Sequence, residues 1–426
     1  MEIFLVGGAV RDTLMGEPVK DRDWLVVGAT RAEMLMGGYV EVGDDFPVFL
    51  HPETREEYAL ARAARNQRAQ ESIEDLSAPG VTLEEDLSRR DLTMNAMAQR
   101  ARKSEDVAYG QLVDPYGGAD DIRDRVFRHV GDSFAEDPIR ILRLARFAAR
   151  YADFTVAPET LVLMRRMVEQ GAVDALVPDR VWKEVSRGLL EKTPSRMLQV
   201  LRECGALARL LPEVDRLYGV AQPAQWHPEI DTGIHIEMVL DYAAKINAPL
   251  AVRFAGLVHD LGKELTPKDK LPSHHGHEAS GVPLVEAVCK RFKVPNECAE
   301  LAVVVTQEHG NIHASGGLRA TALMRLLERC DAIRRPDRFR MALLACDCDA
   351  KGRLGLESRV YPQRDVLGGV LDVAMRIDMR AVSAAAIARG KKGPDIGIEI
   401  RRARIGALEK YYNADKETGM RPNRPT

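Results

Sequence analysis

The spacing of apolar residues changes near Pro138, and this change restricts the chain to a mixed N-terminal part followed by a helical remainder. Before Pro138, short apolar runs of strand length alternate with helical pieces and turn residues. After it, segments such as PIRILRLARFAARY (138–151) repeat apolar residues at helical intervals, with almost no strand pattern. The sequence therefore predicts an α+β fold whose strands are confined to the first third of the chain.

Four structural parts are predicted from the changes in pattern. They are an α+β domain at 1–137, a helical segment at 138–215, a helical domain at 216–370 and a C-terminal helical tail at 371–426. Within the first, residues 64–80 are polar and aperiodic, which predicts a mobile loop.

Charge and composition exclude several classes of protein. The formal net charge of −3 does not attract a polyanion such as a nucleic acid to the protein as a whole. Residues 138–210, however, hold 13 Arg and Lys against 8 Asp and Glu, a local excess of 13 − 8 = 5 positive charges. No apolar run approaches the roughly 18 residues of a membrane span, and the opening MEIFLV reads as a first strand rather than a signal peptide. Six sparse cysteines without CxxC pairs predict reduced thiols. We therefore expect a cytoplasmic protein without a membrane partner.

The stretch KDRDWLVV (20–27) places two carboxylates directly ahead of an apolar strand. Residues i and i+2 of a strand share a face, so Asp21 and Asp23 are predicted to project side by side. Paired carboxylates bind hard cations such as Mg²⁺, usually together with substrate phosphates. Upstream, VGGAVRD (6–12) predicts a strand, a Gly-Gly turn and a helix start, where backbone N–H groups and Arg11 favour phosphate.

Each of these features has an ordinary explanation when it stands alone. A Gly-Gly pair is usually a plain turn, and two nearby aspartates are usually a solvated turn. In the order strand, Gly-Gly, Arg, then paired Asp on the next strand, they are typical of a nucleotidyltransferase palm. Two metal ions held there activate an attacking hydroxyl and stabilise the leaving pyrophosphate.

Several ordered motifs carry a resemblance to a known family. GGAVRDTLMG, DRDW, RRDLTMNAMA (89–98), LVDPYGGADDIRDRVFRHV (112–130) and EDPIRILRLARFAARY (136–151) resemble the bacterial CCA-adding tRNA nucleotidyltransferases, relatives of bacterial poly(A) polymerases. The resemblance covers most of the chain. It implies a nucleotidyltransferase palm, a helical neck and body, a helical HD domain and a small helical cap. The implied activity is template-independent addition and repair of the tRNA 3′-terminal CCA from CTP and ATP, with release of pyrophosphate.

The resemblance also implies roles for individual residues. Asp21 and Asp23 match the Mg²⁺ ligands, and Glu57 is a less secure candidate for a third carboxylate. The positions that match nucleotide contacts are Gly8, Arg11, Arg90, Arg143 and Arg146. Arg150 follows them on the same expected helix, where we predict a solvated basic face.

Asp137 and Arg140 in EDPIR have two possible roles. The first is structural, with Asp137 as helix N-cap and Pro138 at the first helical position. The second is implied by the family, in which this Asp and Arg select the incoming base. Cytosine and adenine each present an amine donor beside a ring-nitrogen acceptor, which suits a carboxylate and a guanidinium. Uracil and guanine present the opposite pattern and would leave both side chains unpaired.

A second set of residues follows the order H…HD…D. His235, His259, Asp260 and Asp349 match the metal ligands of HD-superfamily phosphohydrolases, in which imidazoles and carboxylates from separate helices hold a divalent metal. The resemblance implies phosphatase, 2′,3′-cyclic phosphodiesterase and 2′-nucleotidase activity with Ni²⁺ or another divalent transition metal. Lys263 is a candidate phosphate contact. The other nearby histidines are candidates for a second metal or for phosphate contacts, or are ordinary surface residues: His274, His275, His277, His309 and His313.

Three alternatives to a CCA-adding enzyme remain open at this point. The chain is compatible with a poly(A) polymerase, with an HD phosphohydrolase whose palm only binds RNA, and with a plain RNA-binding module. The expected partners are tRNA, through its 3′ end and acceptor stem, and the nucleotides CTP and ATP. Monomer and homodimer are equally compatible with the sequence.

Overall fold

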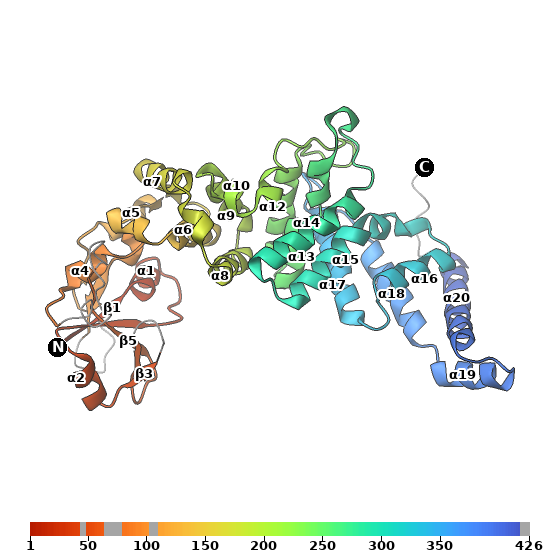
Figure 1. The fold of residues 1–426 in the computed structure, drawn as a ribbon, viewed down its shortest axis with the longest axis horizontal. Helices are drawn as coiled ribbons and strands as arrows, with labels where there is room; N and C mark the ends of the chain where they lie inside the picture. The colour runs from red at the N-terminus through yellow and green to blue at the C-terminus, as the bar shows by residue number, and fades with distance from the viewer. Residues whose placement is uncertain (43–47, 64–78, 102–109, 418–426) are drawn as a thin grey trace. The chain divides into compact units, whose positions relative to one another are not determined.

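The computed structural model describes residues 1–42, 48–63, 79–101 and 110–417 (Figure 1). The predicted loop at 64–80 lies almost entirely outside these ranges. The chain divides into two compact units, one formed by 1–176 and 203–209 and the other by 177–202 and 210–426. The predicted boundaries at 137, 215 and 370 remain predictions. None of the helices in the described ranges combines the length and the apolar character that crossing a bilayer requires.

The first unit contains a mixed sheet in the strand order β3-β4-β5-β2-β1-β6-β7. Its strands are β1 (Glu2–Val6), β2 (Asp23–Val27), β3 (Val40–Val42), β4 (Val48–Leu50), β5 (Glu57–Leu60), β6 (Ala98–Arg100) and β7 (Leu112–Val113). Neighbouring strands are antiparallel except β2 and β5, which are parallel. The strands predicted in MEIFLV and KDRDWLVV are therefore present as β1 and β2.

Both faces of the central strands are buried, which explains why their sequences are continuously apolar. Phe4 and Val6 of β1 pack in one hydrophobic cluster, whereas Leu5 packs in another together with Val10 of α1 (Gly8–Leu14). The remaining helices of this unit are α2 (Arg31–Met36), α4 (Leu83–Ser88), α5 (Gly118–Asp124), α6 (Ile139–Arg150) and α7 (Pro158–Glu169), with 3₁₀ helices η1 (Thr93–Asn95), η2 (Asp132–Glu136) and η3 (Ala172–Ala175).

One strand is missing from the sequence-based prediction. β9 (Thr155–Val156) pairs in parallel with β8 (Val126–Phe127), within the region predicted to be helical. Two residues are too few to show a periodicity, and the pairing joins segments that are far apart in the sequence. Only the folded backbone reveals it.

The second unit is helical throughout its described residues (Figure 1). Its helices are α8 (Pro178–Leu189), α11 (Pro212–Asp215), α12 (Thr232–Lys245), α13 (Leu250–Val258), α14 (His277–Phe292), α15 (Asn296–His313), α16 (Ala320–Arg329), α17 (Pro336–Lys351), α18 (Gln363–Met375), α19 (Met379–Ala388) and α20 (Pro394–Glu417). The chain passes between the units through α9 (Pro194–Glu203) and α10 (Ala206–Leu210). The fold is thus α+β with a helical remainder, as predicted.

Helix α13 lies at the centre of the second unit. All of its residues from Ala251 to Val258 are buried, and it packs against α8, α12, α15 and α17. A helix that is apolar on every side is a core helix. It places His259, which follows directly at its C-terminal end, deep inside the unit.

Candidate active sites

The paired carboxylates of KDRDWLVV lie at the start of β2. Asp23 is the first residue of the strand and Asp21 precedes it, so only Asp23 belongs to the strand itself. Asp23 is in register with Glu57 on the parallel neighbour β5 and with Val6 on β1. Residues in register on adjacent strands share a face. Glu57, the less secure candidate, is therefore brought beside Asp23.

The charge balance at Asp23 favours a bound cation. The residue is solvent-exposed, but neighbouring protein atoms partly desolvate its carboxylate, and this raises its pKa above the ordinary value. Arg90 opposes the rise in pKa, and the charge of Asp21 adds to it. Asp21, Asp23 and Arg90 thus interact electrostatically, and a divalent ion would relieve the repulsion between the two carboxylates.

Gly7 makes the turn between β1 and α1. Its φ of 66° lies in the left-handed region, and a Cβ there would lie 2.9 Å from Arg90 Nη1. Glycine is required on both counts, because other residues are strained at this φ and a side chain would displace Arg90. Gly8, the predicted triphosphate contact, follows as the first residue of α1.

Arg11 is buried rather than free in a phosphate site. Its Nε and Nη2 donate to Asp12 Oδ1 at 2.8 and 2.7 Å, and its Nη1 donates to Asn95 Oδ1 at 2.7 Å. The guanidinium carbon lies 5.2 Å from the ring centroid of Phe147 and 5.6 Å from that of Tyr151. Arg11 is only 4% exposed. Through Asn95 and Phe147 its side chain connects α1 with η1 and α6. This contact set is a structural role that the sequence pattern did not predict.

The RRD motif is built around a buried carboxylate. Asp86 is fully buried and pairs with Arg89 at 2.5 Å and with Arg90 at 3.1 Å. Burial raises the pKa of Asp86, but the two arginines outweigh burial and lower it overall. Asp86 on α4 was missed in the sequence, although its spacing of three and four residues from Arg89 and Arg90, which follow the helix, is a recognisable helix-pair signal.

Removing this carboxylate is expected to destabilise the first unit strongly. Asp86→Ala leaves Arg89 and Arg90 without their buried partner, and breaking a buried ion pair costs about 3–5 kcal/mol. Asp120 pairs with Arg123 on an exposed surface, with 69% of its side chain accessible, so Asp120→Ala is a matched control with an expected cost below about 1 kcal/mol. Urea unfolding of both variants measures the difference. Equal midpoints would refute the structural role of Asp86.

Two arginines of α6 form hydrogen bonds to residues of the RRD motif. Arg143 Nε donates to Asp91 Oδ2 at 2.8 Å. Arg140 donates from its two terminal nitrogens to the carbonyl oxygens of Ser133 at 2.7 Å and Arg89 at 2.6 Å. These contacts hold both guanidinium groups in fixed orientations beside the RRD motif.

Arg146 and Arg150 differ in their surroundings. The guanidinium of Arg146 lies 4.6 Å from the ring centroid of Phe147. Arg150 Nη2 donates to Glu17 Oε2 at 2.6 Å and to Asp12 Oδ2 at 3.2 Å. The prediction that Arg150 belongs to a solvated face is wrong, because α1 and its following turn bring these two carboxylates to it.

Asp137 does cap the start of α6. Its Oδ1 accepts a hydrogen bond from the Ile139 N–H at 3.2 Å. Helix α6 begins at Ile139, one residue later than expected, although Pro138 already has helical angles of φ −59° and ψ −18°. The capping role of Asp137 is therefore present in the structure, and it does not exclude a role in base selection.

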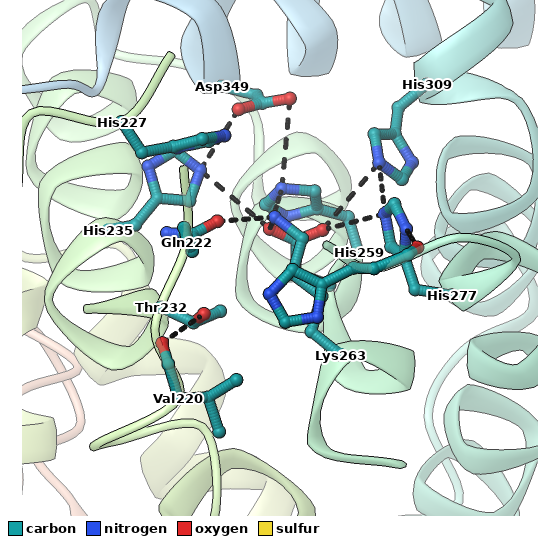
Figure 2. A network of polar contacts seen from close by, with 12 residues as sticks. Val220, Gln222, His227, Thr232, His235, His259, Lys263, His277, His309 and Asp349 are labelled. Atoms are coloured by element: carbon teal, nitrogen blue, oxygen red, sulfur yellow. Dashed lines mark hydrogen bonds and ion pairs between the residues drawn. The ribbon is translucent and has the colours of Figure 1, made fainter. Parts of the chain in front are cut away.

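The H…HD…D residues of the second unit converge although they come from separate helices (Figure 2). His235 lies on α12, His259 and Asp260 follow α13, and Asp349 lies on α17. Ligand atoms of His235, His259 and Asp349 all lie within 4.8 Å of one another. All four residues are at most 4% exposed, so the structure brings together every predicted HD ligand.

The second ring nitrogen of His259 faces two carboxylates. Its Nδ1 lies 2.9 Å from the Gly256 carbonyl, which can only accept, so Nδ1 carries a proton. The other nitrogen, Nε2, faces Asp260 Oδ2 at 3.3 Å and Asp349 Oδ2 at 3.8 Å. Burial lowers the pKa of His259, but these carboxylates outweigh burial and raise it overall, so positive charge is favoured at this position. A divalent metal held by His259 and these carboxylates would supply that charge in place of a proton.

A second group shares Asp260 and shows the same signature. Asp260, His277 and His309 offer ligand atoms within 4.8 Å of one another. His277 donates from Nδ1 to the His274 carbonyl at 2.7 Å, and His309 Nδ1 faces two carbonyls of its own helix at 3.1 Å. Their Nε2 atoms lie 3.1 Å apart, and His277 Nε2 also lies 3.3 Å from Asp260 Oδ1. Burial lowers the pKa of His277, but Asp260 outweighs burial and raises it overall, whereas burial lowers the pKa of His309 to about 3. The geometry fits a second metal that shares Asp260 with the first.

Neighbouring residues orient the HD ligands. Arg353 Nη2 donates to Asp349 Oδ1 at 3.0 Å, and His313 Nε2 lies 2.6 Å from Asp349 Oδ2. Burial raises the pKa of Asp349, but Arg353 and His313 outweigh it and hold the pKa well below its ordinary value. On the other side of the group, Glu229 Oε1 lies 2.9 Å from His235 Nδ1. A carboxylate behind a histidine ligand fixes the ring and raises its basicity.

Lys263 lies inside this network (Figure 2). Its Nζ donates to Gln222 Oε1 at 2.5 Å and lies 2.7 Å from Asp260 Oδ2, as an ion pair without hydrogen-bond geometry. Roles for Glu229, Arg353 and Gln222 were not predicted from the sequence. Glu229 stands in the histidine-rich stretch WHPEIDTGIH and Arg353 four residues after Asp349, which are weak signals, whereas Gln222 gave none.

His274 and His275 belong to neither metal group. His274 Nε2 lies 2.9 Å from the Ala221 carbonyl, and its Nδ1 lies 2.8 Å from Thr266 Oγ1. His275 is exposed. Of the five additional histidines considered, His277 and His309 lie in the second group, and His313 contacts the ligand Asp349 instead.

Comparison with known proteins identifies both domains. Models of the Poly A polymerase head domain, of the probable RNA and SrmB-binding site of polymerase A, and of the HD domain match residues 3–128, 153–218 and 232–340. The chain is 60% identical to a multifunctional CCA protein of Paracidovorax citrulli, with 97% of this chain and 98% of that protein covered. It is 58% identical to one from Acidovorax sp. strain JS42, with 99% of both chains covered.

Solved structures show a similar fold at low identity. The CCA-adding enzyme of Bacillus stearothermophilus in complex with CTP matches with a TM-score of 0.64 at 21% identity, covering 96% of this chain and 89% of that one. The Thermotoga maritima CCA-adding enzyme complexed with tRNA matches with a TM-score of 0.61 at 18% identity, covering 100% and 88%. Nucleotidyltransferase head and HD domains depend on divalent metal ions. The chain belongs to the family of multifunctional CCA proteins, enzymes in which a nucleotidyltransferase head domain precedes an HD domain.

Proposed function

We propose that the protein adds and repairs the 3′-terminal CCA of tRNA, transferring CMP, CMP and AMP from CTP and ATP. In each step the 3′-hydroxyl oxygen of the RNA forms a bond to the α-phosphorus, the bond to the β-phosphate bridge breaks, and pyrophosphate leaves while the hydroxyl proton passes to solvent. The observation that carries this proposal is the carboxylate set of Asp23, Asp21 and Glu57 at the starts of the interior strands β2 and β5, with Arg90 close by.

The residues of the first unit have distinct proposed roles. Asp21 and Asp23 hold Mg²⁺, and Glu57 supports them from β5. Bound there, the metal would supply Lewis-acid stabilisation of the phosphates. The proposed nucleotide contacts are Gly8, Arg11, Arg90, Arg143 and Arg146. Of these, Arg11 must act mainly by shaping the site, because Asp12 and Asn95 occupy three of its N–H donors.

The overall proposal is tested with tRNA that lacks its terminal CCA. CTP alone should extend it by two residues, and CTP with ATP by three. Extension by ATP alone into a long tract would instead show a poly(A) polymerase. No extension with any nucleotide would leave only RNA binding for the first unit.

Base selection is proposed to rest on Asp137 and Arg140. The carboxylate would accept from the exocyclic amine of cytosine or adenine, and the guanidinium would donate to the ring nitrogen. The carbonyl oxygens of Ser133 and Arg89 support this role. They hold the Arg140 guanidinium in one orientation, while its other N–H groups stay available for the base.

Asp137→Asn separates base selection from helix capping. Asn caps helices as well as Asp, so the melting temperature should stay nearly unchanged, whereas an amide offers the base a donor in place of an acceptor. Losing one good base contact costs about 1–3 kcal/mol of discrimination, so the preference for CTP over UTP should fall roughly 5- to 150-fold. Asp378, which caps α19, is the matched control: Asp378→Ala should lower stability and leave base ratios unchanged. An Asp137→Asn enzyme that rejects UTP like the parent would leave Asp137 as a cap alone.

The second unit is proposed to be a metal-dependent phosphohydrolase acting on phosphomonoesters, nucleoside 2′-phosphates and 2′,3′-cyclic phosphates. His235, His259, Asp260 and Asp349 would hold one ion, Ni²⁺ or another divalent transition metal. The metal would supply Lewis-acid activation of water. In hydrolysis of a cyclic diester, a water oxygen bonds to phosphorus, one P–O bond to the ribose breaks, and the released ribose oxygen takes up a proton.

A second ion is proposed between Asp260, His277 and His309. Its support is the convergence of these three side chains, whose ligand atoms lie within 4.8 Å of one another. Lys263, beside Asp260, would add positive charge for the phosphate.

A further inference from the structure

A cavity of about 900 Å³ adjoins the HD metal centre, within the second unit. Residues of the centre form part of its wall, among them Lys263, His277 and His313. The remainder of the wall is largely apolar and includes Trp226 and Val360. This volume lies within the roughly 300–1,000 Å³ of small-molecule sites and exceeds what a phosphate group alone needs.

The two large apolar side chains of this wall are unusually exposed. Trp226 is 56% exposed, and Val360 at 82% is the most exposed large hydrophobic residue in the described part of the chain. Single exposed apolar residues are common, but exposed residues that line one cavity beside a catalytic centre mark a ligand site.

Trp226 is held close to the metal ligands. Arg353 donates through Nη1 to the Trp226 carbonyl at 3.1 Å and through Nη2 to Asp349 Oδ1 at 3.0 Å. The next residue, His227, packs edge-on against the ligand His235 with ring centroids 4.7 Å apart. One side chain thus separates the Trp226 backbone from a metal ligand, and the Trp226 residue lines the same cavity as Lys263 and His277.

We infer that this cavity is a nucleobase subsite, in which the base of a nucleoside 2′-phosphate or 2′,3′-cyclic phosphate stacks on the Trp226 indole. The inference rests on the proposed phosphohydrolase function and specifies its substrate as a nucleotide held by its base. An indole stacks on every base face with little sequence preference, so the subsite accepts all four bases. Val360 supplies further apolar contact.

The test compares two substrates that share the reacting group but differ in the base. Trp226→Ala should raise KM for 2′,3′-cyclic AMP roughly 5- to 150-fold, the range expected for loss of one stacked base. Hydrolysis of glycerol 1,2-cyclic phosphate, which has no base, should change less than about twofold. Trp226→Phe should retain most of the affinity. Ile387→Ala is the matched control, because Ile387 on α19 is 59% exposed and lies outside the cavity lining.

A binding measurement separates failure of the subsite from failure of the hydrolase. Adenosine should quench the parent's tryptophan fluorescence, and the quenching should disappear in Trp226→Phe but persist in Trp182→Phe. Equal losses on both cyclic phosphates in Trp226→Ala would overturn the inference and leave the hydrolase intact. If the parent hydrolyses neither ester, the proposed function fails, and adenosine quenching still decides the subsite. Absence of quenching by adenosine would overturn it.

Discussion

Replacing Asp23 by Asn is expected to abolish CCA addition while the phosphohydrolase activity of the second unit stays near that of the parent. A ligand to the catalytic metal supports several kcal/mol of transition-state stabilisation, so its loss should lower the rate of CMP incorporation by at least about 10³-fold. The HD residues lie in the other unit and share no ligand with Asp23.

The same substitution should not destabilise the fold. Burial and the charge of Asp21 raise the pKa of Asp23 against the opposing effect of Arg90, so the ionised form is disfavoured in the folded state. A group whose pKa is higher in the folded than in the unfolded protein stabilises the fold in its protonated form. That stabilisation is lost as the pH rises through the pKa of the folded state. At neutral pH the neutral Asn therefore keeps or raises the melting temperature. Loss of activity together with equal or higher stability is the signature of a functional carboxylate.

Primer extension on tRNA without its CCA, beside a melting curve, checks both expectations. The control is Asp153→Asn, because Asp153 pairs with Arg125 on an exposed surface of the same unit. CCA addition within a few-fold of the parent in Asp23→Asn would remove Asp23 from the catalytic set. A large drop in melting temperature would make its role structural.

Replacing Asp260 by Asn is expected to eliminate hydrolysis of 2′,3′-cyclic AMP while CCA addition survives. Asp260 is 1% exposed and is the one residue common to both proposed metal groups, so its loss should disrupt both ions. The rate should fall by at least about 10³-fold, because each ion supplies several kcal/mol of stabilisation. Metal content gives an independent readout. The second unit of the parent should bind two divalent transition-metal ions, that of His309→Ala one, and that of Asp260→Asn fewer than one, in addition to any Mg²⁺ held by the first unit.

His275→Ala is the matched control for this set. His275 stands beside His274 on the loop that precedes α14 and belongs to neither metal group, so metal content should be unchanged. Hydrolysis by Asp260→Asn at a parental rate would refute the HD assignment. Two ions bound to His309→Ala would refute the second metal while leaving the first in place.

Much of the local structure was predictable from the sequence. Continuous apolar runs identify the buried strands β1 and β2, because both faces of these strands are covered. The Gly-Gly turn is predictable because Gly7 must take a positive φ. The order H…HD…D identified four residues that the folded unit brings within ligand distance. These features depend on short-range backbone preferences or on motif order, which the sequence contains directly.

Other features depend on which segments meet in the folded chain. Glu57 becomes a neighbour of Asp23 only through the register of two parallel strands, and Arg150 meets Glu17 only because α6 packs against the region of α1. Asp260 is shared by two histidine groups because α13, α14 and α15 pack together.

The sequence by itself determined the α+β class, the nucleotidyltransferase motifs and the HD signature, because each is encoded by neighbouring residues or by their order. The tertiary structure alone decided which charges are paired and which ring nitrogens face each other. It therefore buried Arg11 under two aromatic rings, added His277 and His309 to the HD centre, and exposed Trp226 beside it. Contacts over long sequence separations are set by packing and register, and no local pattern in the sequence records them.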